Sequence, residues 1–111
     1  MKIKVPKEVQ VGAHKYKTLF SEWADKHERN GTVVHPDLVI YLAPNPQNSN
    51  LTATYIHEVV HVISRIFGIG LTEAETDGIA EGFTQFLIDG LGVELDWSDI
   101  ETIKIDDKKT G

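Results

Sequence analysis

The stretch YIHEVVHVI, residues 55–63, places His57, Glu58 and His61 in the order His-Glu-x-x-His. It lies within residues 52–67, which contain no glycine or proline and have helical spacing. Residues four apart lie on one face of an α-helix, so both imidazoles can bind the same ion. The other side of the predicted helix is apolar and consists of Ile56, Val59, Val60, Val62 and Ile63. The stretch therefore predicts a buried helix that carries half of a metal site.

The spacing of these residues favours zinc chemistry. Two neutral imidazoles and one carboxylate suit Zn²⁺ and leave one coordination position open for water. Glu58 is offset from the line of the histidines by one residue, so it lies beside the metal rather than on it. From there a carboxylate can take a proton from water whose pKa the metal has lowered. We therefore expect Glu58 to be the general base and the third ligand to come from elsewhere.

The third ligand is sought on the helix that follows Gly68-Ile-Gly70. Thr72 and Glu75 form a capping-box pattern at its start, and the helix is expected to run to about Ile88 and to stop at Gly90 or Gly92. Four acidic residues lie on this helix: Glu73, Glu75, Asp77 and Glu81. Glu75 is explained by its role in the cap.

The two segments together resemble the gluzincins, the His-Glu-x-x-His metallopeptidases with a glutamate as third ligand. Residues 73–80, EAETDGIA, are similar to the glutamate helix of that group. The chain is also similar to minimal gluzincins, to small phage and prophage metallopeptidase-like proteins and to ImmA-like proteins. The motif match covers about residues 55–91. The resemblance implies a zincin-like fold, Glu73 as ligand, and Asp77 as the carboxylate that orients a ligand histidine.

Spacing alone leaves the third ligand open. Only eleven residues separate His61 from Glu73. A regular helical hairpin with its turn near residue 69 would place residues 77–81 opposite the histidines, which favours Glu81 and then Asp77. Glu73 can return only if Gly68 and Gly70 turn the chain sharply through positive φ. Otherwise Glu73 would merely complement the helix dipole.

The organisation of the chain predicts an α+β fold in one zincin-like domain spanning residues 1–111. We expect a β-rich half over about 1–50, metal-binding helices over about 51–92 and a tail over about 93–111. The β-rich half is predicted to hold a mixed sheet of three to four strands. Its expected elements are strands at Lys2–Val5 and Val9–Val11, a strand or helix start at His14–Phe20, a helix at Glu22–Arg29 capped by Ser21, a strand at Leu38–Ala43 and a loop at 44–50.

Several other side chains have candidate roles. Leu38–Ala43 is either a core strand or the edge strand on which an extended peptide could pair. A donor for the tetrahedral oxyanion could be Tyr41, Tyr55, His35 or Arg65. His14, His27 and His35 are expected to be surface histidines. Phe83, Phe86, Leu87 and Leu91 are expected in the core, and the two tryptophans, Trp23 and Trp97, have no assigned role.

Composition limits the classes of binding partner and the kinds of site that the protein can have. The formal net charge of −6 disfavours nucleic-acid binding, and the absence of cysteine excludes thiolate metal sites and a cysteine nucleophile. No apolar run is long enough to span a bilayer, and no secretory signal is recognisable at the N-terminus. We expect a cytoplasmic protein that acts on a peptide or protein substrate, with no nucleic-acid or membrane partner.

The leading functional hypothesis is a zinc metallopeptidase. The alternative is a zinc-binding module that is catalytically silent, or a latent enzyme, as in a zymogen, blocked by its own tail. The tail carries five carboxylates, and one could take the open metal position: Asp96, Asp99, Glu101, Asp106 and Asp107. A purely structural site has no use for an acid between the histidines, so Glu58 favours the enzyme.

Overall fold

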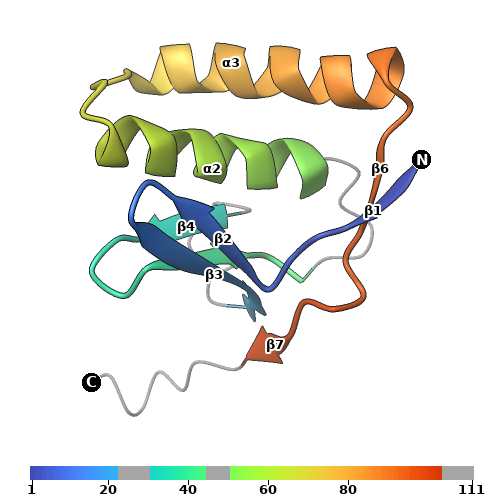
Figure 1. Cartoon of the computed structure of the whole chain (residues 1–111), viewed down its shortest axis with the longest axis horizontal. Coiled ribbons are helices and arrows are strands. Elements are labelled where there is room, and N and C mark those ends of the chain that lie inside the picture. Colours follow the sequence, from blue (N-terminus) through green and yellow to red (C-terminus); the bar gives the residue numbers. More distant parts are fainter. Residues whose placement is uncertain (23–30, 45–50, 104–111) are drawn as a thin grey trace.

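The computed structural model describes residues 1–22, 31–44 and 51–103, and these are arranged in three layers. Figure 1 shows α3 (Glu73–Gln85) above α2 (Leu51–Ile66), and α2 above a β-sheet. The middle helix α2 carries the His-Glu-x-x-His motif and has apolar contacts with the sheet on one side and with α3 on the other. The predicted α+β class is confirmed, with a mixed sheet and two helices.

The main sheet is mixed. Its strand order is β2 (Glu8–Val11), β3 (His14–Ser21), β5 (Val39–Leu42) and β4 (Gly31–Val34), with β7 (Thr102–Ile103) also pairing with β3. Strands β2 and β3 form an antiparallel hairpin, β5 runs parallel to β3, and β4 runs antiparallel to β5. The segment 14–20 is thus a strand, not the start of a helix.

Of the two roles considered for Leu38–Ala43, core strand or edge strand, the structure has the core strand. Strand β5 pairs on both sides, so Leu38–Ala43 cannot be the free edge. Among the described strands, β4 has β5 on one side and no strand on the other, so β4 is an edge of the sheet, at the end opposite β2. Strand β4 was not predicted, although Thr32, Val33 and Val34 are three consecutive β-branched residues, which favour a strand. The predicted helix 22–29 lies almost wholly outside the described residues.

The turn between β4 and β5 is tight and defined. The backbone N–H of Leu38 donates to the carbonyl of His35 at 3.1 Å, which closes a β-turn with Pro36 in its second position. Leu38 has φ of 56°, a left-handed conformation that costs a leucine about 1–2 kcal/mol. The hairpin therefore holds His35 in one backbone position at the end of the edge strand.

The C-terminal segment packs back on the body as far as Ile103. Strand β6 (Glu94–Asp96) pairs in parallel with β1 (Lys2–Lys4) to form a second, two-stranded sheet. Ile100 is buried, and Trp97 meets the ring of Tyr55 edge-on with ring centroids 5.3 Å apart. The previously unassigned Trp97 is thus a packing residue; Trp23 lies outside the described residues.

Helix α2 is anchored by apolar side chains on the sheet. Val62 is fully buried, and Tyr55 joins the same cluster as Tyr16, Ile40 and Leu42 from the strands. The predicted apolar residues are buried or half-buried, but not on one side: Val59, Val62 and Ile63 pack toward the sheet, whereas Ile56 and Val60 pack against α3. The prediction of a single apolar side was therefore wrong, because α2 is the middle layer and is covered on two sides. In the described residues, no helix combines the length and apolarity needed to cross a membrane.

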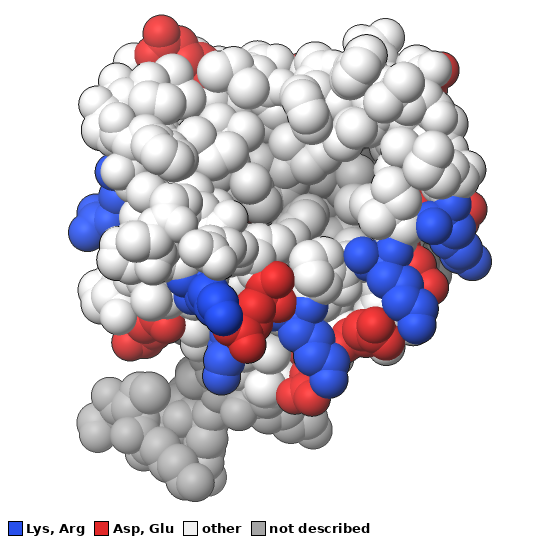
Figure 2. All heavy atoms as spheres, viewed as in Figure 1, with Lys and Arg blue, Asp and Glu red and all other residues white. Residues whose placement is uncertain are grey.

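Helix α3 packs on α2 through a smaller cluster and continues into a π-helical turn, η1 (Phe86–Gly90). The cluster consists of Ile56, Val60 and Ala80, with Leu71 and Leu87 against it. Leu87 is thus placed as expected, but Phe83, Phe86 and Leu91 are 51–55% exposed, so their assignment to the core was wrong. The reason is that α3 is the outermost layer and has a neighbour on one side only. In Figure 2, the side of the helical layer that is turned to the viewer carries few charged side chains.

Candidate metal centre

Three side chains converge where α3 crosses the motif face of α2. The Nε2 atoms of His57 and His61 lie 3.0 Å apart. One carboxylate oxygen of Glu73 lies 2.8 Å from His57 Nε2, and the other lies 3.1 Å from His61 Nε2. In the described part of the chain these three residues are the group of acidic and histidine side chains whose donor atoms could hold one ion.

The spacing of these atoms suits a small tetrahedral ion. Zinc binds nitrogen and oxygen at about 2.0–2.2 Å, which places neighbouring ligand atoms about 3.3 Å apart at the corners of a tetrahedron. The three observed separations, 2.8, 3.0 and 3.1 Å, are slightly shorter than that edge. Small side-chain adjustments would therefore bring His57, His61 and Glu73 to bonding distance of one ion.

The protonation of His57 also favours a cation at this point. Its Nδ1 lies 2.9 Å from a carboxylate oxygen of Asp77, which can only accept a hydrogen bond when ionised. The ring proton of the neutral imidazole therefore belongs on Nδ1, and Nε2 presents a lone pair. That lone pair lies 2.8 Å from a carboxylate oxygen of Glu73, which is also an acceptor. Two acceptors at this distance repel each other unless a cation or a second proton lies between them.

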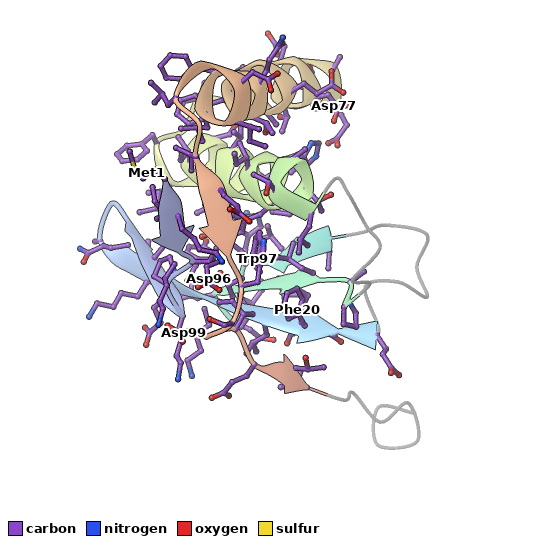
Figure 3. The ribbon with its side chains drawn as sticks, turned by 90° about the vertical axis from the view of Figure 1, so that its right-hand side faces the viewer. Met1, Phe20, Asp77, Asp96, Trp97 and Asp99 are labelled. Carbon is purple, nitrogen blue, oxygen red and sulfur yellow. The ribbon has the colours of Figure 1, made fainter. Side chains whose placement is uncertain are left out.

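Asp77 lies where the family resemblance places the orienting carboxylate. Figure 3 shows it on the side of α3 that faces α2. Such a carboxylate fixes both the tautomer and the direction of a ligand histidine. Glu81, one turn further along α3, lines the same cleft but is not part of the three-residue cluster.

The turn between the helices explains why Glu73, rather than Glu81, reaches the histidines. Gly68 and Gly70 have φ of 62° and 72°, as a sharp early turn requires. The N–H of Ile69 donates to the Ser64 carbonyl at 2.9 Å and that of Gly68 to the Arg65 carbonyl at 3.3 Å, which is a Schellman motif. The chain therefore reverses within one turn of the end of α2 instead of forming a wide hairpin.

The side chain of Ser64 stabilises this turn with a further hydrogen bond, a role that was not predicted. Its hydroxyl accepts a hydrogen bond from the backbone N–H of Leu71 at 3.0 Å, and the residue is buried. Ser64 lies in the last turn of α2, and the residue that donates to it is seven positions further along the chain. No local sequence pattern predicts a hydrogen bond of this kind. Ser64 thus links the end of α2 to the residue that precedes the cap of α3.

The N-terminus of α3 is fixed by the predicted capping box. Thr72 Oγ1 accepts from the N–H of Glu75 at 3.1 Å, and Glu75 accepts from the N–H of Thr72 at 2.8 Å. The hydrogen bond from the Thr72 backbone lowers the pKa of Glu75 from its usual value. Because the cap occupies Glu75, Glu73 is the first-turn acid that remains for the histidines.

The three side chains lie in a cleft of about 1090 Å³ between the edge of the sheet and α3. Glu58 lines this cleft and is only 7% exposed, whereas the side chains of His57 and His61 are 18% and 30% exposed. Gly31 of β4 packs on Glu58: a Cβ on this glycine would lie 3.3 Å from Glu58 Cγ. The edge strand β4 therefore packs directly against Glu58, the carboxylate that the motif predicts as general base.

The candidates for the oxyanion donor are separated by the structure. His35 lines the cleft, while Tyr41, Tyr55 and Arg65 are not among its described lining residues. Tyr55 is buried against Trp97, and this burial raises the pKa of its hydroxyl. His35, expected at the surface, is half-buried at the wall of the cleft and is not part of the three-residue cluster. His14 is exposed on β3, away from the cleft, and His27 lies outside the described residues.

The described part of the tail does not enter the cleft. Asp96 accepts from the N–H of Ser98 at 3.0 Å, which lowers the pKa of Asp96. Asp99 and Glu101 each lie 3.8 Å from a lysine, Lys4 and Lys7 respectively. Figure 3 shows Asp96 and Asp99 beside the sheets, apart from Asp77 on the helical layer. Asp106 and Asp107 lie outside the described residues.

The chain was also compared with known proteins. No protein-family model, curated protein or solved structure matches it. The candidate metal centre therefore stands on the geometry of its own residues.

Proposed function

We propose that this protein is a zinc-dependent peptidase with a zincin-like arrangement of edge strand, motif helix and glutamate helix. The observation that carries the proposal is the convergence of His57, His61 and Glu73 at one point in an open cleft that Glu58 also lines. Structural zinc sites are closed by four protein ligands, whereas catalytic sites have three and an open position. Three converging side chains at a cleft favour the catalytic class.

Each residue of the site has a distinct task in this proposal. His57, His61 and Glu73 hold the ion, and Asp77 keeps His57 in the tautomer that presents Nε2. A zinc ion held there supplies Lewis acidity, which polarises a peptide carbonyl and lowers the pKa of water. Glu58 takes a proton from the attacking water and delivers it to the leaving amine.

The edge strand supports a peptide substrate. Strand β4 lines the cleft with Gly31, Thr32 and Val33, and its outer side carries no strand among the described residues. An extended peptide can add to such an edge through main-chain hydrogen bonds. Pairing with an extended peptide was first considered for Leu38–Ala43. We assign it to β4 instead, because β5 is paired on both sides.

Metal content tests the first half of the proposal. Purified protein, loaded with zinc and dialysed, should retain about one zinc per chain by elemental analysis, and His57→Ala and His61→Ala should retain almost none. Bound zinc should also raise the thermal midpoint of the wild type, because an ion that bridges α2 and α3 stabilises the folded state. Two histidines and a carboxylate also suit iron(II), so retention of iron in preference to zinc would contradict the assignment.

Hydrolysis tests the second half. A fluorogenic peptide mixture should be cleaved by the zinc-loaded wild type and not by Glu58→Gln, which should keep its zinc because Glu58 is not a ligand. A zinc-loaded wild type that cleaves nothing in a broad peptide mixture would favour the silent or latent zinc-binding module instead. Equal cleavage by Glu58→Gln would refute the role of Glu58.

A further inference from the structure

His35 lies on the wall of the cleft opposite the helices. It follows the edge strand β4 and lines the same cleft as His57, His61 and Glu58. A peptide carbonyl attacked at the metal centre would therefore lie between the metal ligands on α2 and the imidazole of His35.

The position of His35 is fixed by its backbone and by its side chain. Its carbonyl accepts from Leu38 in the β-turn that contains Pro36, so the backbone has one conformation. Its Nδ1 lies 3.2 Å from the hydroxyl of Tyr16, and the two rings meet edge-on at an angle of 84°. Tyr16 is 1% exposed, so the partner of His35 is itself held in the core.

The hydrogen bond to Tyr16 determines which ring nitrogen of His35 carries the proton. In the described contacts of Tyr16, the imidazole is the acceptor within reach of its hydroxyl, and a buried O–H that donates to nothing is costly. The hydroxyl therefore donates to Nδ1, and the neutral ring carries its proton on Nε2. Burial, Arg65 and His61 lower the pKa of His35, which keeps the ring neutral near pH 7.

We infer that His35 is a catalytic residue of the proposed peptidase: its Nε2–H donates a hydrogen bond to the anionic oxygen that develops on the scissile carbonyl. Tyr16 is its positioning residue. This inference rests on the proposed function. It also selects one residue from the four eligible donors, because Tyr55 is in the core and neither Tyr41 nor Arg65 is among the described residues that line the cleft.

The step balances without transfer of the His35 proton. Water forms a bond to the carbonyl carbon, the π-electron pair of the carbonyl moves to its oxygen, and Glu58 takes one proton from the water. The C–N bond then breaks, the oxygen's electron pair re-forms the carbonyl, and Glu58 gives its proton to the amine. Throughout, His35 only donates a hydrogen bond, which is strongest when the oxygen is charged.

Inorganic phosphate is a probe of this donor that does not depend on finding a substrate. Phosphate is tetrahedral and anionic, as is the centre formed from the carbonyl, whereas acetohydroxamate chelates the metal as a planar ligand. Loss of the donor in His35→Phe should weaken phosphate binding to the zinc-loaded protein by about 10- to 100-fold, with hydroxamate binding unchanged within about 2-fold. His35→Gln, which retains an N–H donor, should recover part of the loss. The matched control is His14→Phe, a histidine on β3 outside the cleft.

Kinetics on a single peptide from the mixture that the wild type cleaves provide the second readout. His35→Phe should lower kcat by about 100- to 1000-fold with little change in KM, as expected for one oxyanion donor. Tyr16→Phe should lower kcat less, because the ring remains but its tautomer is no longer fixed. A merely structural role for His35 would instead change stability and KM.

Each outcome decides the inference. Wild-type phosphate affinity in His35→Phe, or no zinc-dependent phosphate binding in the wild type, would overturn it. Loss of zinc from His35→Phe would also overturn it, since His35 would then be a metal ligand. A wild type that hydrolyses peptides, an inactive Glu58→Gln and a fully active His35→Phe would refute the inference and leave the proposed function intact. A wild type that binds no zinc would refute both.

Discussion

His57 Nδ1 and Asp77 Oδ1 lie 2.9 Å apart, so the first helix of the hairpin is tied to the second by a contact behind the candidate metal centre. The contact fixes the tautomer of His57 and aims its Nε2 at Glu73. The cluster that packs α3 on α2 is small, so these polar contacts, and an ion between them, matter more for the docking of α3 than they would in a large core.

Asp77→Asn should weaken zinc binding by about 10- to 100-fold, because the amide no longer fixes the proton of His57 on Nδ1. Competition with a chromophoric chelator measures the affinity. Glu81→Gln is the matched control, one turn along the same helix, and should change the affinity by no more than about 2-fold. Equal effects of the two variants would contradict the orienting role of Asp77.

Glu73→Gln should reduce zinc affinity by about 100-fold or more, since zinc sites gain about 10–16 kcal/mol from roughly four ligands and an amide is a poor one. If Glu73 only complemented the helix dipole, the variant would lose about 0.3–1 kcal/mol of stability without metal and nothing of its zinc affinity. Chelator competition and metal-free denaturation together separate these two roles. A large loss in Glu81→Gln with a normal Glu73→Gln would reverse the ligand assignment.

Ser64→Ala should lower both stability and zinc affinity, although Ser64 is not one of the three residues of the cluster. The substitution removes the acceptor of the Leu71 N–H and should cost about 1–2 kcal/mol in denaturant unfolding. A loosened turn would also misplace Glu73, so zinc binding should weaken as well. Ser98→Ala, at an exposed serine, is the control and should leave both quantities unchanged. A destabilised Ser64→Ala with intact zinc affinity would show that the turn does not position Glu73.

Gly31→Ala and Gly78→Ala should have opposite effects. A Cβ at Gly31 would lie 2.8 Å from Thr54 Cγ2 and 3.3 Å from Glu58 Cγ, so the alanine should cost about 1–3 kcal/mol and displace Glu58. Hydrolysis should fall much more than zinc affinity. A Cβ at Gly78 would meet nothing within 4 Å, and alanine there should stabilise α3 by about 0.5–1 kcal/mol. An active Gly31→Ala would show that β4 does not need to approach Glu58 this closely.

The charge of Glu75 should stabilise the protein at neutral pH and not in acid. The folded state lowers the pKa of Glu75 from its usual 4.5, so its contribution is present above that value and is lost as the pH falls through the folded pKa. Glu75→Gln keeps an acceptor for the cap but no charge. The difference in thermal midpoint between wild type and variant, measured in a chelator, should be largest near pH 7 and vanish near pH 2. A constant difference across this range would mean that the charge is irrelevant.

Local patterns in the chain predicted those parts of the fold that depend on near neighbours in sequence. The four-residue spacing of His57 and His61 placed both rings on one helical face, and the capping box at Thr72 marked the start of α3. The positive φ of Gly68 and Gly70 was predicted as the condition for returning Glu73. Each of these features is set by backbone geometry within one or two turns, which is why one sequence contains enough information for it.

The tertiary structure decided the relations between distant segments. Strand order put β4 at an edge of the sheet and β5 inside it, and the third layer left Phe83, Phe86 and Leu91 exposed although their pattern favours a core. The hydroxyl of Ser64 and the approach of Tyr16 to His35 became visible only once these segments were packed together. A sequence determines which side chains a segment presents on each face. Which face meets which partner depends on long-range pairing, where competing arrangements differ by only a few kcal/mol out of large opposing terms.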